Sequence, residues 1–242
     1  MKTLEIHEER YKNFLTNKKV AIVGPSESAF FRENGKYIDS FDIVVRINRG
    51  IEMVNGNGLF IGSRTDILYN SLDFVPSSGG TLNGLTDEVK FICCPYSIEE
   101  HTYRDSNVIP IFDKFNIRFI NSNIYNKLKF DTDSRVSSGF GAIVDLLQFD
   151  IEQLFVTGID FYRSLYHRTY PSQVNNMALS VDAIEKDLEF KIYDDNRHHN
   201  PDRQYAKFKE IASKDARVKL DPFLKKITKD SSYDNWDTIP RN

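Results

Sequence analysis

The chain has 242 residues, of which 40% are hydrophobic and 28% charged, and its formal net charge is -3. A chain of this length can bury roughly 70% of the surface that it exposes when unfolded, so we expect a single domain over residues 1–242. The weak negative charge argues against the basic face that a nucleic-acid partner requires. No apolar stretch approaches the ~20 residues of a transmembrane helix. The charged start lacks the apolar core of a signal peptide, which predicts a cytoplasmic protein.

Short apolar runs alternate with amphipathic helical patterns, which is typical of an α/β fold. The first helix is predicted over the charged N-terminal segment, with an apolar side formed by Leu4, Tyr11, Phe14 and Leu15. The expected strands are Val20–Val23, Ile43–Ile47, Ile67–Tyr69, Phe91–Cys94, Arg118–Ile120, Leu154–Gly158 and Val218–Leu220. Further helices are expected over Ser138–Phe149 and Asp202–Ser213. Adjacent cysteines on one strand point to opposite faces, so the pair in the fourth strand fits a reducing compartment rather than a disulfide.

Two polar segments late in the chain carry separate expectations. The segment over residues 162–200, with a weak helix over Asn176–Phe190, predicts a lid above the site. The tail over residues 222–242 is polar, and we expect it to be partly disordered. Its Lys225-Lys226 pair beside Phe223 predicts either a weak peripheral contact with a membrane surface or, more commonly, a solvated face.

Polar residues follow three of the predicted strands. Gly24, Pro25 and Ser26 come directly after the first strand, and Asn48 and Asn70 follow the second and third. The carboxyl ends of parallel strands are where open α/β sheets bind ligands, so the two asparagines and the glycine turn predict a nucleoside pocket. The glycine loop has neither dinucleotide-binding nor P-loop spacing, so an ordinary turn remains the alternative for that loop.

A D-x-D tripeptide, Asp131-Thr132-Asp133, offers a different reading of the chain. Carboxylates at this spacing can hold Mn²⁺ or Mg²⁺ in enzymes that use UDP- or GDP-sugars. The tripeptide lies in the polar run Asp131–Arg135, which itself reads as a solvated loop. The sequence therefore predicts no metal site, with a metal-dependent sugar transferase as the alternative.

Four blocks together resemble the family 29 sialyltransferases. The segments GPS, IDSFDIVVRIN and IGSRTDILYNS resemble the large sialylmotif, and VSSGFGAIVDLLQFDIEQLFVTGIDFY resembles the small one. His167 falls at the histidine of the third motif, and His199, five residues before Gln204, falls at the histidine of the short last motif. Four blocks in order are far more specific than any one of them, and they cover roughly two-thirds of the chain.

The chain departs from that family in several places. The first glycine loop is short, and Gln204 replaces the acidic residue of the last motif. The cysteine pair that joins the large and the small motif in the secretory-pathway members is absent. We also expect no membrane anchor of the kind that the secretory-pathway members carry. These differences favour a bacterial or viral type of enzyme, and they leave the donor sugar open between sialic acid and a related acid such as Kdo.

The resemblance implies a Rossmann-like variant of the GT-A fold, with a mostly parallel central sheet flanked by helices and covered by a lid. It implies an inverting, metal-independent transfer from a CMP-sugar to a glycan or glycolipid hydroxyl, with the CMP-sugar as substrate and no cofactor. His199 is the expected base, with His198 as its rival, and His167 is expected at the leaving phosphate. The expected CMP-binding residues are Gly24, Pro25, Ser26, Asn48, Asn70, Ser137, Ser138, Gly139, Gly158 and Asp160. A third alternative is a nucleotide- or glycan-binding domain without catalysis.

Overall fold

A parallel β-sheet forms the centre of the molecule. The computed structural model describes residues 2–72, 80, 82–102, 115–171 and 199–235, and in them one seven-stranded sheet with every neighbouring pair parallel. Its strands are β1 (Lys19–Val23), β2 (Ile43–Ile47), β3 (Ile67–Tyr69), β4 (Phe91–Cys94), β5 (Ile117–Phe119), β6 (Gln153–Thr157) and β7 (Val218–Leu220). Strands buried on both faces read as unbroken apolar runs, which is why these segments stand out in the sequence. The predicted α/β fold with a mostly parallel sheet is confirmed.

The strand order is β5-β4-β3-β2-β1-β6-β7. The chain moves outward from β1 to β5 and then returns to the other side of β1 as β6 and β7. The order therefore reverses between β1 and β6, the kind of position where open α/β sheets bind ligands. Val23 in β1 pairs with Arg46 in β2 and with Thr157 in β6. These three strands consequently end at nearly the same level and direct their following loops to one place.

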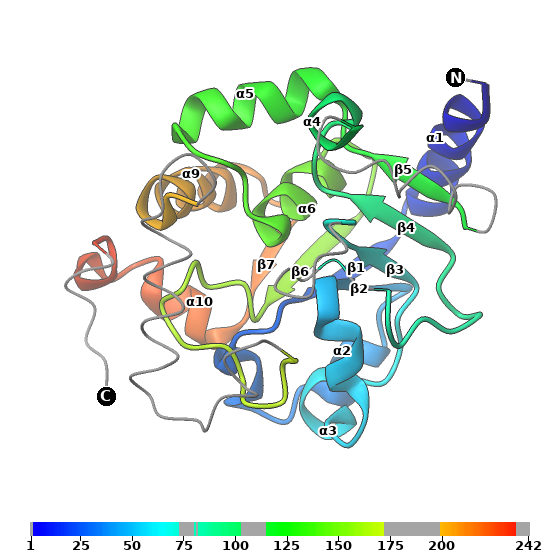
Figure 1. Ribbon diagram of the computed structural model, residues 1–242. Helices are drawn as coiled ribbons and strands as arrows, with labels where there is room; N and C mark the ends of the chain where they lie inside the picture. Colours follow the sequence, from blue (N-terminus) through cyan, green and yellow to red (C-terminus); the bar gives the residue numbers. More distant parts are fainter. Residues whose placement is uncertain (1, 73–79, 81, 103–114, 172–198, 236–242) are drawn as a thin grey trace.

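Helices cover both faces of the sheet (Figure 1). The larger core cluster joins the sheet to α1, α5, α6, α9 and α10, and the smaller one joins it to η1, α2, η2 and α3. Strand residues alternate between them, with Val20 and Ile22 in the larger cluster and Ala21 and Val23 in the smaller. The helical elements are α1 (Lys2–Leu15), η1 (Glu27–Phe30), α2 (Gly35–Asp39), η2 (Asn48–Val54), α3 (Gly58–Ile61), α4 (Ile98–Thr102), α5 (Ser122–Thr132), α6 (Ser138–Leu146), α9 (Pro201–Lys214), α10 (Pro222–Ile227) and η4 (Ser231–Tyr233).

Most of the predicted elements are present, with shifted ends. The N-terminal helix is confirmed as α1, and Tyr11 and Leu15 on its apolar side are completely buried. The fifth strand begins one residue before its predicted start, and α6 ends earlier than expected, at Leu146. The expected solvated loop from Asp131 onward is wrong at its start, because Asp131 and Thr132 are the last residues of α5 and Thr132 is buried. The weak helix over 176–190 lies outside the described residues.

The described part of the C-terminal tail, up to Asn235, contains two short helical elements. Helix α10 begins after Asp221, whose side chain accepts a hydrogen bond from the backbone N–H of Leu224 at 2.8 Å. Leu224 and Ile227 are fully buried, and Tyr233 in η4 is 9% exposed. Two apolar residues three positions apart are enough to dock a short helix. The overall polarity of the tail conceals this pattern in the sequence. Among the described helices, none is long and apolar enough to cross a membrane.

A buried charge network joins the sheet to α1 and α6. Arg118 in β5 is 2% exposed and pairs with Asp145 of α6, which is 1% exposed. Its guanidinium also donates to Glu8 of α1 at 2.9 Å and lies 4.4 Å from the centroid of the Tyr11 ring. Tyr69 donates a hydrogen bond to the same Asp145 carboxylate. Pairing with a carboxylate strongly reduces the cost of a buried charge, so the network explains how Arg118 lies inside this strand.

Candidate functional site

One pocket lies where the loops after β1, β2 and β6 meet. Its walls come from these three loops, from the start of α6 and from His199, two residues before α9. The lining residues are Pro25, Ser26, Ile47, Asn48, Ser137, Ser138, Gly139, Gly158, Ile159, Asp160, Phe161, Tyr162, Tyr166, Tyr170 and His199. The cavity volume is about 90 Å³. Ligand pockets usually measure about 300–1,000 Å³, so a nucleotide would require lining side chains to move outward.

The two glycines of the site allow β1 and β6 to end in contact. A Cβ atom on Gly24 would lie 2.1 Å from the carbonyl oxygen of Gly158, and Gly158 itself has a φ of +67°. The backbone N–H of Ser26 donates to that same carbonyl at 3.1 Å. Gly24 itself does not line the pocket. It lets two backbone loops pack together, which places Pro25 and Ser26 beside Gly158.

Asp160 is the centre of a buried serine cluster next to these loops. Its carboxylate, with no exposed surface, accepts hydrogen bonds from Ser26 at 3.1 Å, from Ser28 at 2.8 Å and from Ser164. Burial raises the pKa of Asp160, while the hydrogen bonds from the three hydroxyls act in the opposite direction. The cluster ties the loop after β1 to the loop after β6. Asp160 therefore orients Ser26, which lines the pocket.

The amino end of α6 opens onto the same pocket. Ser137 caps the helix by accepting a hydrogen bond from the N–H of Phe140, and Ser138 and Gly139 form its first turn. The free N–H groups and the dipole at a helix start attract anions, so this turn is suited to a phosphate. Asn48 connects it to the sheet, because its amide donates to the Ser138 hydroxyl at 3.3 Å. The side-chain oxygen of Asn48 accepts a hydrogen bond from the backbone N–H of Ser71 at 2.9 Å.

Asn70 and Arg46 take structural positions instead of joining the pocket wall. Asn70 is fully buried, and its side-chain oxygen accepts from the N–H of Leu72 at 2.8 Å. Arg46 is 1% exposed and donates to the carbonyl oxygen of Ile61 at 2.8 Å and to the hydroxyl of Thr65 at 3.2 Å. Burial lowers the pKa of Arg46 to about 10. These contacts hold the loop between α3 and β3 against β2, the strand that ends at Asn48.

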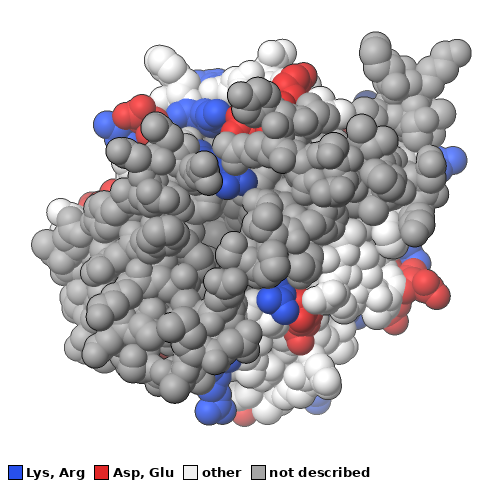
Figure 2. All heavy atoms as spheres, viewed as in Figure 1, with Lys and Arg blue, Asp and Glu red and all other residues white. Residues whose placement is uncertain are grey.

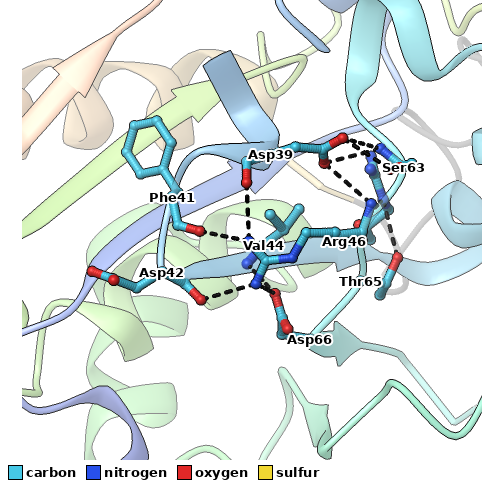
Figure 3. Close-up of polar contacts among 9 residues, drawn as sticks. Asp39, Phe41, Asp42, Val44, Arg46, Ser63, Thr65 and Asp66 are labelled. Carbon is cyan, nitrogen blue, oxygen red and sulfur yellow. Dashed lines mark hydrogen bonds and ion pairs between the residues drawn. The ribbon is translucent and has the colours of Figure 1, made fainter. Parts of the chain in front are cut away.

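A second set of contacts completes that loop (Figure 3). The Asp39 carboxylate accepts from the backbone N–H of Ser63 at 2.9 Å, and the Arg64 guanidinium donates to the carbonyl oxygen of Phe41 at 2.7 Å. Arg64 also pairs with Asp66 at 2.9 Å.

His199 reaches the pocket from the other side, directly before α9. Its Nδ1 lies 2.9 Å from the carbonyl oxygen of Arg135, and its ring stacks with Tyr162 at a centroid distance of 6.4 Å. Because a carbonyl can only accept, Nδ1 carries the hydrogen in this contact, which leaves Nε2 as the basic nitrogen. The rival His198 lies outside the described residues. The geometry of His199 is that of a histidine whose tautomer is set by the backbone.

His167 is near the pocket but is not part of its wall. Its ring stacks on Phe30 at a centroid distance of 3.5 Å, and its Nδ1 lies 2.8 Å from the hydroxyl of Thr169. Partial burial lowers its pKa, with a smaller contribution from Arg168. Its backbone N–H donates to the carbonyl oxygen of Pro25 at 3.0 Å. The described geometry therefore places His167 as a support for the loop after β1.

Tyrosines supply the pocket residues that sequence reasoning missed. Tyr162, Tyr166 and Tyr170 all line the cavity, and the Tyr162 and Tyr166 rings lie 6.1 Å apart. Phe161 and Tyr162 have φ values of 56° and 63°, which turn the chain sharply after Asp160. Burial raises the pKa of Tyr162, so its hydroxyl stays protonated near neutral pH and can donate a hydrogen bond. The spacing of four residues among the three tyrosines was the available signal in the sequence.

Asp131 and Asp133 are both paired with basic side chains. Asp131 lies 3.0 Å from Lys127 and 3.5 Å from Lys207, and Asp133 lies 3.1 Å from Arg203. Neither residue lines the pocket. Within the described residues, no cluster of three metal-ligating side chains occurs. Figure 2 shows acidic and basic side chains interspersed among the described residues of one face.

Solved structures provide the informative comparison. No family model matches the chain, and no curated protein matches it in sequence. A mammalian sialyltransferase in complex with Gal-β-1,3-GalNAc-ortho-nitrophenol is similar over 87% of this chain and 71% of its own, with 15% identity and a TM-score of 0.57. The sialyltransferase CstII from Campylobacter jejuni, in complex with the substrate analogue CMP-3FNeuAc, is similar over 84% of this chain and 80% of its own, with 17% identity and a TM-score of 0.50. The chain has the sialyltransferase fold. The resemblance read from the four sequence blocks is thus confirmed for the fold.

Proposed function

We propose that the chain is a glycosyltransferase that moves sialic acid, or a related acid such as Kdo, from a CMP-sugar to a hydroxyl of a glycan or glycolipid. The observation that carries the proposal is the position of His199. Its oriented imidazole and the first turn of α6 line one pocket, at the point where the strand order of a sialyltransferase fold reverses. A base and an anion site on one cavity are the two elements that this reaction requires.

The phosphate of CMP would lie at the first turn of α6. Ser138 and Gly139 line this part of the pocket, and we propose that their backbone N–H groups, together with the tyrosine hydroxyls, donate to the phosphate. CMP leaves with a single phosphate, whereas UDP leaves with two and commonly needs a divalent ion. Fixed hydrogen-bond donors stabilise a developing phosphate charge, so we propose a reaction that needs no metal or cofactor.

The acceptor would be activated by His199. Its Nε2 takes the proton of the acceptor hydroxyl while the oxygen attacks the anomeric carbon. The new carbon–oxygen bond forms as the bond to the phosphate oxygen breaks, and CMP leaves with that electron pair. A single displacement of this kind inverts the configuration. The Arg135 carbonyl holds the imidazole in the tautomer that presents Nε2.

Release of CMP in the presence of EDTA tests the proposal. The protein is mixed with CMP-Neu5Ac or CMP-Kdo and a panel of glycan acceptors, and CMP binding is measured separately by calorimetry. We expect transfer in EDTA, and we expect His199→Ala to lose at least about a hundredfold in kcat with CMP affinity retained, because a positioned base contributes about 10²–10⁴. His198→Ala and His167→Ala serve as comparisons. No CMP binding and no release would overturn the proposed function, whereas full activity in His199→Ala would overturn the base alone.

We also propose a cytoplasmic location with weak peripheral contact at α10. Lys225 and Lys226 are exposed, and the 56% exposed Phe31 packs edge-on against Phe223 at 5.3 Å between ring centroids. Basic and aromatic groups together favour an anionic membrane surface. Sedimentation with phosphatidylserine vesicles should be weak, and it should be lost in a Lys225→Glu, Lys226→Glu variant. Equal sedimentation of the variant would refute the contact.

A further inference from the structure

Gln204 is a buried amide whose three side-chain hydrogen bonds all go to one loop. It lies in the first turn of α9 and is 1% exposed. Its Nε2 donates to the carbonyl oxygen of Arg135 at 2.8 Å and to the hydroxyl of Ser134 at 3.1 Å. Its Oε1 accepts from the backbone N–H of Ser137 at 3.1 Å. The Gln204 side chain thus contacts the loop between α5 and α6 at Ser134, Arg135 and Ser137.

The atoms that Gln204 holds belong to the two halves of the pocket. The Arg135 carbonyl receives both the Gln204 amide and Nδ1–H of His199, at 2.8 Å and 2.9 Å. Ser137 is the cap of α6, the helix whose first turn lines the pocket. Displacement of the amide would therefore move the hydrogen-bond acceptor of the histidine and the cap of the helix.

We propose that Gln204 is a positioning residue that fixes His199 relative to the start of α6 through its contacts with Arg135 and Ser137. The inference rests on the proposed function for its kinetic readout. Gln204 stands where the similar family has an acidic residue, and the contacts require an amide at this position. The Arg135 carbonyl needs an N–H donor, which a carboxylate lacks, whereas the Ser137 N–H needs only an acceptor and the Ser134 hydroxyl can act as either.

Replacement of Gln204 by glutamate separates the Ser137 contact from the Arg135 contact, because it retains the first and loses the second. Gln204→Glu has nearly the same shape and keeps an acceptor for the Ser137 N–H, but it loses both donors and places a negative charge against the Arg135 carbonyl. We expect kcat to fall about tenfold to a hundredfold, a part of the about 10²–10⁴ that a positioned base contributes. CMP affinity should stay within about threefold of the original, because the α6 contact survives. Gln204→Met loses all three contacts, and it should weaken CMP binding as well as kcat.

The matched control is Gln148→Glu. Gln148 is an exposed amide just beyond the end of α6, and it donates to the carbonyl oxygen of Val144 in that helix at 3.0 Å. This variant should leave kcat and CMP affinity unchanged. A merely structural role for Gln204 would instead lower the melting temperature of Gln204→Glu and reduce kcat and CMP affinity together.

Nitrogen NMR of the imidazole of His199 completes the test and needs no turnover. The original chain should show Nδ1 protonated and hydrogen-bonded, with the signal assigned by its loss in His199→Ala. In Gln204→Glu the tautomer ratio should shift or the hydrogen-bonded signal should broaden. An unchanged spectrum together with unchanged kcat would overturn the role of Gln204. If the original chain transfers no sugar, the proposed function fails, and the NMR result alone still decides whether Gln204 orients His199.

Discussion

Replacement of Arg118 by methionine should strongly destabilise the fold, because it leaves the Asp145 carboxylate buried without its cation. The two residues are 2% and 1% exposed. Removal of one partner of such a pair costs about 3–5 kcal/mol. For a chain of this size, 1 kcal/mol corresponds to about 2–4 °C in melting temperature, so we expect a fall of about 6–20 °C. Total stabilities are about 5–15 kcal/mol, so the change removes a large part of the total.

Thermal and urea unfolding followed by circular dichroism measure this loss. Glu8→Gln is the matched control, because the Glu8 side chain is 49% exposed and its pair with Arg118 should contribute less than about 1 kcal/mol. Addition of Asp145→Asn to the methionine variant removes the stranded charge and keeps a partner for Tyr69, so it should recover at least half of the loss. If Arg118→Met lowered the melting temperature no more than Glu8→Gln, the reasoning about the buried pair would be refuted.

Three further predictions concern the pocket. Burial raises the pKa of Asp160, so protonation of this carboxyl stabilises the fold below the unfolded pKa of about 3.9. That stabilisation is lost as the pH rises toward the folded pKa. The stability of Asp160→Asn relative to the original chain should therefore grow from about pH 4 upward. Urea titrations at several pH values would contradict this if the difference stayed constant. Gly139→Ala places a Cβ 3.0 Å from the Ile159 side chain and should weaken CMP binding about tenfold by calorimetry. Gly50→Ala, with no atom within 4 Å of its Cβ, should leave CMP binding unchanged. Equal affinities of the two variants would count against the packing argument. Asp131→Asn should retain activity within about twofold in EDTA, and Mn²⁺-dependent activity lost in this variant would favour the metal-dependent alternative.

The sheet could be predicted from the sequence because its strands are buried on both faces. Ile43–Ile47 reads as an apolar run even with Arg46 inside it, since four of its five residues are apolar. The ends of helices and strands are harder to predict where burial depends on residues that are distant in the sequence. Arg118 is buried because Asp145 meets it from another element, which no local pattern indicates. The predicted strand began at Arg118, one residue after the observed start at Ile117. Helix α5 was missed because its buried side includes Thr132, a polar residue that carries no hydrophobic signal.

The candidate site was partly predictable for a related reason. Residues that follow strands, such as Pro25, Asn48 and Gly158, can be placed once the strands are known, because parallel strands end at one edge. The tyrosines could not be placed in that way. Tyr162 reaches the pocket after two positive φ angles that are ordinarily associated with glycine, and no local sequence preference announces such a turn. His199 reaches it through a long segment whose path the sequence does not define.

The contacts of Arg163 make the pocket dependent on residues made much later in the chain. Its guanidinium donates to the carbonyl oxygen of Tyr233 at 3.1 Å and pairs with Asp202 at 2.6 Å, while the residue itself belongs to the loop after β6. During synthesis, one acceptor of Arg163 is therefore added about seventy residues after the arginine itself. A nascent or truncated chain that stops before Tyr233 would carry a buried cation with an incomplete shell, directly beside the pocket. Tags and fusions should accordingly be attached beyond η4 or at the amino end.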